Sequence, residues 1–166
     1  QNDLFRRAQE IADVGAWEYD AEAGTLTLTD QGYRVHGLSP EGEITPERSH
    51  GLFHPEDRPE TEEAFTRAVE EGEPYDVEAR LITDGGEERW VRTRGEPQRG
   101  EDGQVARVRG AIQDITEKKR REQRLRKATE RLRAAIEATP VPLFSLDPGG
   151  QVQLWNRAAE RIFGWS

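Results

Sequence analysis

The chain has 166 residues, of which 33% are hydrophobic and 34% charged, enough for one complete domain and part of a second. The absence of cysteine excludes a disulfide scaffold, a thiolate zinc site and a thiol nucleophile. No apolar run has the length of a membrane span, and no leader resembles a signal peptide. We therefore expect a soluble, cytoplasmic protein. Because the sequence starts at Gln1 and contains no methionine, we also expect it to be a piece of a longer protein.

The net charge of −9 is unevenly distributed along the chain. Residues 1–116 contain 27 acidic and 13 basic side chains, whereas residues 117–137 contain 4 acidic and 9 basic ones. An acidic body repels phosphate backbones, so we expect no nucleic-acid partner. The acid excess is typical of proteins from high-salt habitats, where salt screens the repulsion between like charges.

The first elements are short. Apolar residues at helical spacing predict a lead-in helix over residues 1–13. The period then changes to two, which predicts a hairpin whose turn covers residues 21–24. Thr29 or Asp30 can cap a short helix that ends at Gly37.

A longer helix is predicted between His54 and Gly72. Asp57, with Glu60 three residues later, forms an acidic version of the capping box, and Pro59 suits a first turn. The residues expected on its inner face are Thr61, Ala64, Phe65, Ala68 and Val69. One or two helical turns are expected before it, over residues 46–53.

Alternating apolar residues then predict strands over residues 75–81, 88–93 and 104–115. On the last strand, the residues expected on the core face are Ala106, Val108, Gly110 and Ile112. The order of elements over residues 14–116 predicts an α+β domain, a five-stranded antiparallel sheet with its helices on one face. A βαβ nucleotide-binding fold does not fit this order.

Residues 117–138 return to a helical period and are mostly basic. The stripe that predicts a short coiled-coil-like linker helix consists of Leu125, Ala128, Leu132 and Ile136. Residues 139–166 repeat the strand–turn–strand–helix order of residues 14–37, so they are expected to be the truncated start of a second domain.

Residues 10–120 resemble the PAS sensory domain, in the variant with a C-terminal PAC region that is common in prokaryotic sensor kinases. The features that match occur in order at residues 29–37, 53–57, 75–80, 89–91, 102–103 and 110–116. Residues 125–166 resemble the opening of a second PAS domain. The resemblance implies a small cavity between sheet and helices, and output through the helix that follows the last strand.

Asp114, Ile115 and Thr116 stand where the last strand becomes this helix. Asp114 or Thr116 can accept from the free N–H groups of the first turn, while Ile115 anchors the junction in the core. A helix cap and a coupling point need the same contacts, and the resemblance favours coupling.

The space between sheet and helices is expected to be lined by Trp17, Tyr33, Phe53, Phe65, Leu81, Trp90, Val108 and Ile112. Such residues form an ordinary filled core or hold a small apolar ligand. Without cysteine, a flavin adduct of the light-oxygen-voltage type is excluded. The histidines His36, His50 and His54 lack metal-ligand spacing, so we expect neither haem nor metal.

No catalytic constellation is visible, so we expect no enzymatic activity in this region. The first hypothesis is a sensory input module that regulates a downstream histidine kinase or transducer domain of the same chain. The alternative is a ligand-free PAS module that serves as a dimerisation spacer. The apolar tail and the linker stripe predict a homodimer through residues 117–166.

Overall fold

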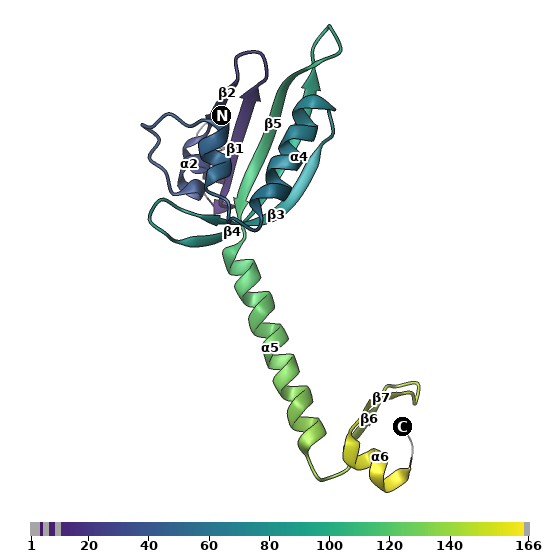
Figure 1. Cartoon of the computed structure of the whole chain (residues 1–166). Helices are drawn as coiled ribbons and strands as arrows, with labels where there is room; N and C mark the ends of the chain where they lie inside the picture. Colours follow the sequence, from purple (N-terminus) through teal and green to yellow (C-terminus); the bar gives the residue numbers. More distant parts are fainter. Residues whose placement is uncertain (1–3, 5–6, 9–10, 165–166) are drawn as a thin grey trace. The chain divides into compact units, whose positions relative to one another are not determined.

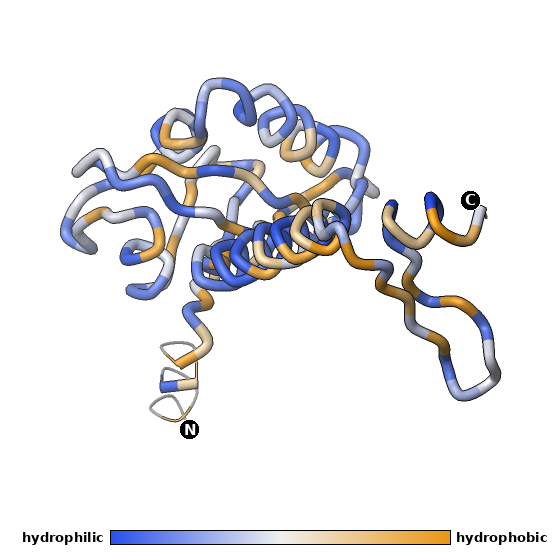
Figure 2. The backbone as a smooth tube through the Cα atoms, turned by 90° about the horizontal axis from the view of Figure 1, so that it is seen from below, coloured by the Kyte–Doolittle hydropathy of each residue, from blue (hydrophilic) through white to orange (hydrophobic). Residues whose placement is uncertain are grey.

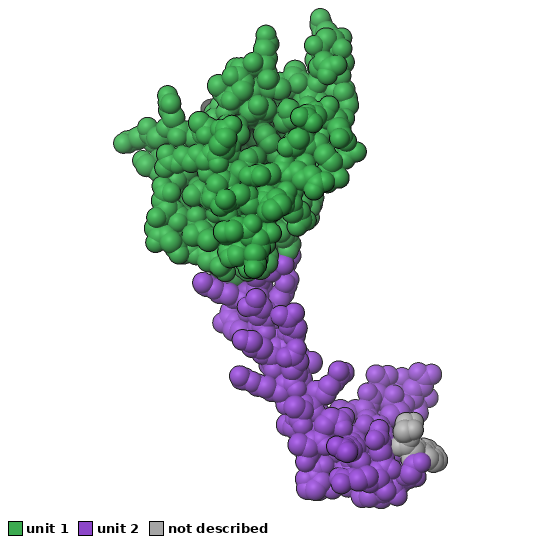
Figure 3. Space-filling view, viewed as in Figure 1, with its two compact units in different colours: residues 1–117 green, residues 118–166 purple. Residues whose placement is uncertain are grey.

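A computed structural model describes residues 4, 7, 8 and 11–164, so the predicted lead-in helix lies largely outside the described residues. The chain forms two compact units, residues 1–117 and residues 118–166 (Figure 3). In the described part of the chain, no helix combines the length and the apolar character needed to cross a bilayer.

The first unit contains a five-stranded antiparallel sheet with the strand order β2-β1-β5-β4-β3 (Figure 1). Its strands are β1 (Val14–Asp20), β2 (Thr25–Leu28), β3 (Tyr75–Ile82), β4 (Glu88–Arg99) and β5 (Val105–Asp114). The first and last strands of the unit are neighbours, because β1 pairs with β5 along its whole length. The predicted α+β fold is confirmed.

Three helices lie between the second and third strands: α2 (Asp30–His36), α3 (Pro46–Gly51) and α4 (Arg58–Glu70). Thr29 caps α2 as predicted, since its side chain accepts from the Gly32 N–H at 3.3 Å. At the other end, Gly37 has a φ of 69°, a left-handed conformation that favours glycine. Thr45 caps α3 in the same way as Thr29 caps α2.

The predicted cap of α4 is wrong. Asp57 occupies the N-cap position with helical backbone angles and makes no side-chain hydrogen bond to the helix. Its carboxylate binds Arg80 on β3 instead, accepting from the Arg80 backbone N–H at 2.8 Å and from Nε at 2.9 Å. A charged partner on the sheet takes the acceptor that an isolated helix would use.

Helix α2 packs on β1 at backbone distance. A Cβ atom at Gly15 on β1 would overlap the backbone of Gly32 on α2, so the two elements touch where neither has a side chain. The predicted core face of α4 is also found, with Thr61, Ala64 and Ala68 buried and Phe65 packed against the core.

A β-bulge alters the predicted alternation on β5. The register shifts between Gln98 and Arg99, and Arg99 pairs with Val105. Val105 is therefore buried, while Ala106 is exposed, the reverse of the prediction. Beyond the bulge the prediction is confirmed, since Val108 and Ile112 are 0% and 2% exposed.

The opposite face of the sheet is charged. Asp76 on β3 pairs with Arg92 at 2.6 Å and with Arg94 at 3.0 Å on β4. Glu18 on β1 pairs with Arg107 and Arg109 on β5. These exposed pairs contribute little to stability, but they keep this face hydrophilic.

Helix α5 (Thr116–Ala138) starts in the first unit and forms most of the second. It is followed by a hairpin of β6 (Phe144–Leu146) and β7 (Val152–Trp155) and by α6 (Arg157–Phe163). Most of α5 is hydrophilic, whereas hydrophobic stretches alternate with hydrophilic ones in the segment that follows it (Figure 2). The predicted repeat of the strand–turn–strand–helix order is confirmed for the described residues, while Trp165 of the predicted apolar tail lies outside them.

Asn156 holds the second unit together and is 0% exposed. Its Oδ1 accepts from the N–H groups of Leu143 at 2.8 Å and Ala159 at 3.0 Å. Its Nδ2 donates to the carbonyl groups of Ile136 and Val141 at 3.0 and 2.9 Å. One buried amide thus joins the end of α5, the hairpin and the start of α6, with its donors and acceptor satisfied.

Candidate functional site

A small cavity lies between the sheet of the first unit and its helices. Its volume is about 40 Å³, space for a few water molecules, because one water needs about 10–15 Å³ by this measure. Its apolar wall consists of Trp17, Leu26, Leu28, Phe53, Phe65 and Ile112. The ring centroid of Phe65 lies 5.1 Å from that of Tyr19 and 6.3 Å from that of Trp17, so the wall at Phe65 belongs to a packed aromatic cluster.

His36, Ser49 and His50 form a polar side of the cavity. His36 Nδ1 lies 2.8 Å from the Gly32 carbonyl oxygen, which only accepts, so Nδ1 carries the proton. Nε2 then accepts from Ser49 Oγ at 3.2 Å. Burial lowers the pKa of His36 below its ordinary value, which favours the neutral ring that these contacts require.

His50 and Tyr75 also line the cavity. The His50 ring packs edge-on against Phe65 with centroids 4.9 Å apart, and burial lowers its pKa. Burial raises the pKa of the Tyr75 hydroxyl, against the opposing effect of its hydrogen bond to Thr93. Both groups are uncharged at neutral pH, so the cavity presents neutral hydrogen-bonding groups beside its apolar wall.

Among the residues predicted to line this space, the structure places Trp17, Phe53, Phe65 and Ile112 at the cavity. Leu81 and Val108 are 0% exposed and belong to the packed core. Tyr33 packs against the core and donates its hydroxyl to the Gly42 carbonyl at 3.3 Å.

The prediction for Trp90 is wrong. Its neighbour Val91 is buried, and side chains alternate along a strand, so Trp90 faces the other side of the sheet. There the Arg80 guanidinium lies 5.9 Å from the centroid of the indole ring, a cation–π contact. Two adjacent apolar residues leave the parity of a strand ambiguous from sequence.

Asp114, Ile115 and Thr116 join the sheet to α5. Asp114 Oδ1 accepts from the N–H of Thr116 at 2.9 Å and from its hydroxyl at 2.5 Å. Thr116 Oγ1 in turn accepts from the Trp90 N–H at 3.0 Å, and the Ile115 N–H donates to the Trp90 carbonyl at 2.8 Å. Ile115 is 5% exposed. The start of α5 is therefore bound to both backbone polar groups, the N–H and the carbonyl, of one residue on β4.

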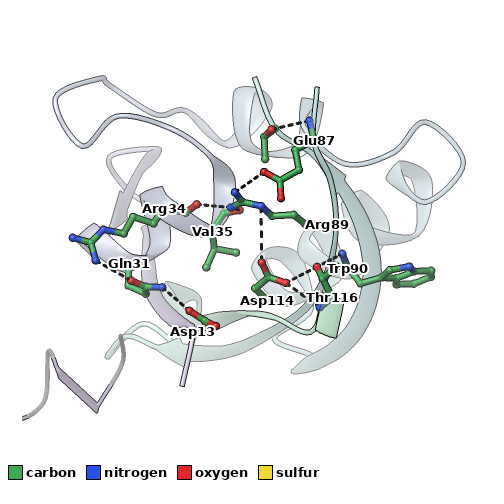
Figure 4. A network of polar contacts seen from close by, with 10 residues as sticks. Asp13, Gln31, Arg34, Val35, Glu87, Arg89, Trp90, Asp114 and Thr116 are labelled. Carbon is green, nitrogen blue, oxygen red and sulfur yellow. Dashed lines mark hydrogen bonds and ion pairs between the residues drawn. The ribbon is translucent and has the colours of Figure 1, made fainter. Parts of the chain in front are cut away.

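Arg89, adjacent to Trp90, completes this junction (Figure 4). Its Nη1 donates to the carbonyl groups of Arg34 and Val35 at 2.6 and 3.0 Å. Its Nη2 donates to Glu87 at 3.0 Å, and its Nε lies 3.9 Å from Asp114 Oδ2. The sequence includes Arg89 in the matching feature at residues 89–91 but does not reveal its role. Two of its partners are backbone carbonyls 54 and 55 positions away, which leave no pattern in the side chains.

A group that could hold a cation consists of His54, Glu56 and Asp57, whose ligand atoms lie within 4.8 Å of one another. Arg80 already supplies positive charge there, because its Nη2 lies 2.8 Å from Glu56 Oε2 and 2.7 Å from Asp57 Oδ1. The geometry fits an arginine–carboxylate cluster between α4 and β3.

The linker stripe lies on α5 as predicted. Leu125 and Leu132 are 71% and 63% exposed, Ala128 is exposed, and Ile136 is half-buried. Leu132 and Ile136 border a groove of about 530 Å³ whose other wall includes Leu154 and Trp155. The groove also has polar lining from Thr129, Arg133, Glu137 and Gln153, and it lies wholly within the second unit.

The comparison with known families agrees with this structure, in which a cavity lies beside a five-stranded antiparallel sheet and hydrogen bonds join the last strand to α5. Residues 25–112 match the PAS fold, and residues 130–166 match it a second time. The chain belongs to the PAS family. The first match lies within the unit that contains the five-stranded sheet, while the second covers the end of α5, a strand hairpin and one helix of the described residues.

Relatives of this PAS chain include sensor kinases. The chain is 31% identical over 162 residues to the sensor protein FixL of Bradyrhizobium diazoefficiens, which covers 98% of the chain and 32% of FixL. It is 34% identical over 113 residues to the blue-light-activated histidine kinase of Brucella ovis, covering 68% of the chain and 22% of that kinase. The chain thus spans a third or less of the length of these relatives.

Solved PAS structures superpose on the chain. A sensory box histidine kinase/response regulator from Burkholderia thailandensis matches with a TM-score of 0.62 and 32% identity, covering 78% of this chain and 98% of that one. A domain of a histidine kinase from Haloarcula marismortui matches with a TM-score of 0.55 and 28% identity, covering 69% and 99%. The comparisons and the sheet topology agree on the fold.

Proposed function

We propose that the chain is a sensory input module that relays the state of its cavity through α5 to an effector on the same polypeptide, such as a histidine kinase. The observation that carries the proposal is the bonding of Asp114 and Thr116, which connects β5, β4 and the first residue of α5. In this proposal the chain itself catalyses nothing, and the effector supplies the chemistry.

The junction suits a relay because its hydrogen bonds restrict movement of the start of α5 relative to β4. Trp90 binds Ile115 through its carbonyl group and Thr116 through its N–H, so a shift of β4 displaces the start of α5. The hydroxyl of Thr116 is fixed by two partners, Asp114 as acceptor and Trp90 as donor. Such hydrogen bonds strengthen one another in a partly buried setting.

The cavity restricts the ligands that the proposal allows. A volume of about 40 Å³ takes a molecule of a few non-hydrogen atoms, apolar on the side of Phe65 and Ile112 and able to bond Ser49 or a histidine on the other. A flavin adduct needs a cysteine, which the sequence lacks. Haem or flavin is far larger than this volume and would require displacement of the aromatic rings that line the cavity.

We further propose that the module acts as a homodimer through α5 and the tail. The exposed side chains of Leu125 and Leu132 are seven residues apart, so they form one stripe along α5. Burying each of them gains about 1.5–3 kcal/mol. A second copy offers the same stripe to this one, which is the symmetric solution that homodimers use.

The alternative is a PAS spacer that senses nothing and only sets the geometry between neighbouring modules. The small volume of the cavity, about 40 Å³, favours it. The two functions differ in whether a change inside the cavity alters the output.

A chimaera tests this difference. In the histidine kinase of Brucella ovis, the segment that aligns with the chain is replaced by the aligned part of the chain, and autophosphorylation is measured. Ser49→Leu fills the cavity, and Ser39→Leu makes the same change at an exposed loop residue. A sensory module predicts that only Ser49→Leu changes the kinase rate and that Thr116→Val removes this response. A spacer predicts no response to Ser49→Leu but a change when four residues, rather than seven, are inserted into α5.

A further inference from the structure

One side chain connects α2, the turn before β4 and the start of α5. The guanidinium of Arg89 lies between the carbonyl groups of Arg34 and Val35, the carboxylate of Glu87 and the carboxylate of Asp114 (Figure 4). These partners belong to three separate segments of the chain: the last turn of α2, the turn before β4, and the end of β5 from which α5 starts. Arginine suits such a position because its donors point in fixed, divergent directions.

The carbonyl groups that Arg89 binds belong to the cavity side of the domain. Arg34 and Val35 precede His36 in the last turn of α2, and His36 lines the cavity, where its Nε2 accepts from Ser49 Oγ on α3. Val35 is 2% exposed and packs in the core. A displacement of the His36 ring therefore moves the same helical turn whose carbonyl groups Arg89 holds.

The other side of Arg89 faces the output helix. Asp114 uses one oxygen for Thr116 and turns the other, Oδ2, toward Arg89 Nε at 3.9 Å. This separation is longer than the 2.7–2.9 Å of a direct charge-assisted hydrogen bond, so the guanidinium can approach Asp114 by about 1 Å. A polar depression of about 370 Å³ beside Val35 and Arg89 leaves room for this movement.

We infer that Arg89 is a positioning residue that couples the last turn of α2 to the start of α5, so that a change in the cavity reaches α5 through His36, the carbonyl groups of α2, Arg89 and Asp114. When the last turn of α2 moves away, Arg89 loses two acceptors and shifts toward Asp114. When the turn moves closer, Arg89 moves away from Asp114, and the Asp114 carboxylate then binds only Thr116 among these partners. This route runs through a helix terminus and side chains, in addition to the backbone pairing of the strands.

The inference rests on the proposed function only for its use in signalling, because the link itself is a property of the first unit. It is tested by amide hydrogen exchange, followed by NMR, on the whole 166-residue chain. The reporting amides are those of Trp90, Ile115 and Thr116, each of which is hydrogen-bonded at the junction. The input change is Ser49→Ala, which removes the partner of His36 Nε2.

Ser49→Ala is expected to change exchange at the junction by about 3- to 10-fold in the native background, a coupling of the size seen between residues of one network. In the Arg89→Gln background the same change should have no effect there. Arg89→Lys should restore only part of it, because the compact ammonium group of lysine cannot span the acceptors that the wider guanidinium reaches in several directions. An equal effect of Ser49→Ala in the native and Arg89→Gln backgrounds, or no effect in the native background, overturns the inference.

Arg99 provides a matched control. It lies on the same strand and clamps another helix, with Nη2 donating to the Glu71 carbonyl at 2.7 Å and Nη1 to the Gly103 carbonyl at 2.8 Å. Arg99→Gln should raise exchange near these two residues and leave the response of the junction to Ser49→Ala intact. Loss of that response in Arg99→Gln would mean that any weakened strand has the effect, which contradicts a specific role of Arg89.

A reverse measurement covers the case in which Arg89 variants do not fold. Asp114→Asn keeps Arg89, and coupling is reciprocal, so exchange of the Gly37 amide, which donates to the Arg34 carbonyl, should change. An unchanged Gly37 amide contradicts the link. The two proposals can fail separately. If Ser49→Leu does not change the activity of the chimaeric kinase but the exchange coupling is observed, the proposed function is refuted and the role of Arg89 is retained.

Discussion

Asp57 and Arg80 are joined by three hydrogen bonds, although α4 begins beside one and β3 contains the other. Asp57 accepts from the backbone N–H, Nε and Nη2 of Arg80 at 2.8, 2.9 and 2.7 Å. The side chains are 20% and 25% exposed. The pair fixes the start of α4 to the sheet and thereby holds one wall of the cavity.

Asp57→Asn is expected to lower the free energy of unfolding by about 1 kcal/mol at neutral pH, since the bonds to Arg80 lose their charge. The Arg80 hydrogen bonds lower the pKa of Asp57. The stabilisation is therefore complete above the unfolded pKa of about 3.9 and disappears as the pH falls through the lower folded value. Urea unfolding between neutral and acidic pH measures this, and the two proteins should converge in acid. Glu56→Gln removes a second charged partner of Arg80, but one whose side chain is 73% exposed, so it serves as a comparison and should lower the midpoint less.

Asp114→Ala and Thr116→Val are each expected to cost about 0.5–2 kcal/mol, as lost caps do, while the domain stays folded. Thr116→Val leaves the Trp90 N–H without its acceptor. In a kinase chimaera both changes should separate input from output. Thr129→Val is the matched control, because this exposed threonine on α5 donates only to the Leu125 carbonyl of its own helix. Wild-type signalling with unchanged stability in both variants contradicts a coupling role.

The burial of His36 is expected to make the folded chain less stable in mild acid. Burial lowers its pKa in the folded chain, so between the unfolded value of about 6.5 and the folded value the unfolded chain binds the extra proton. Stability should therefore fall as the pH drops below about 6.5, and His36→Gln should show a smaller fall. Denaturation midpoints across this range measure the difference. Equal pH dependence in both proteins would show that His36 is not held neutral by the fold.

The proposed homodimer is tested by light scattering on the whole chain and on a chain truncated after Thr116. The whole chain should be a dimer, and the truncated one a monomer, because the exposed stripe of Leu125 and Leu132 is lost. Leu125→Glu with Leu132→Glu should also give a monomer without unfolding the first unit. A monomeric whole chain, or a truncated chain that remains dimeric, refutes an interface through residues 117–166.

The purified protein is expected to be colourless. The cavity of about 40 Å³ takes no large chromophore, and the sequence has no cysteine for a flavin adduct. A visible absorption spectrum of freshly purified protein should lack Soret and flavin bands. Native mass spectrometry of the same sample then looks for a bound molecule of a few non-hydrogen atoms, and a chromophore in either measurement contradicts the proposed ligand class.

Local patterns predict most of the fold. Alternation identifies β1 to β5, and Thr29 identifies the start of α2, because these signals depend on neighbours in sequence. The bulge at Gln98 and Arg99 is a property of two paired strands, so the alternation along β5 alone places Val105 and Ala106 on the wrong faces.

The contacts around the cavity and the junction are harder to predict from local sequence patterns. Asp57 has the spacing of a helix cap, yet a partner 23 residues away takes its carboxylate. Arg89 is visible as part of a motif, but its partners on α2 are backbone atoms. The cavity depends on which side of the sheet Trp90 occupies, and two successive apolar residues leave that choice to the tertiary structure.

The N–H of Asp114 donates to the carbonyl of Asp13 at 3.1 Å, and Val14 pairs with Gln113. The chain therefore comes into the first unit and leaves it at the same end of neighbouring strands. A domain whose two ends are adjacent can be inserted, duplicated or removed without changing the fold of the domains before and after it. The second match to the PAS fold within the same 166 residues is what such duplication produces, and Asp13 and Thr116 mark natural joints at which engineered arrays can be cut and spliced.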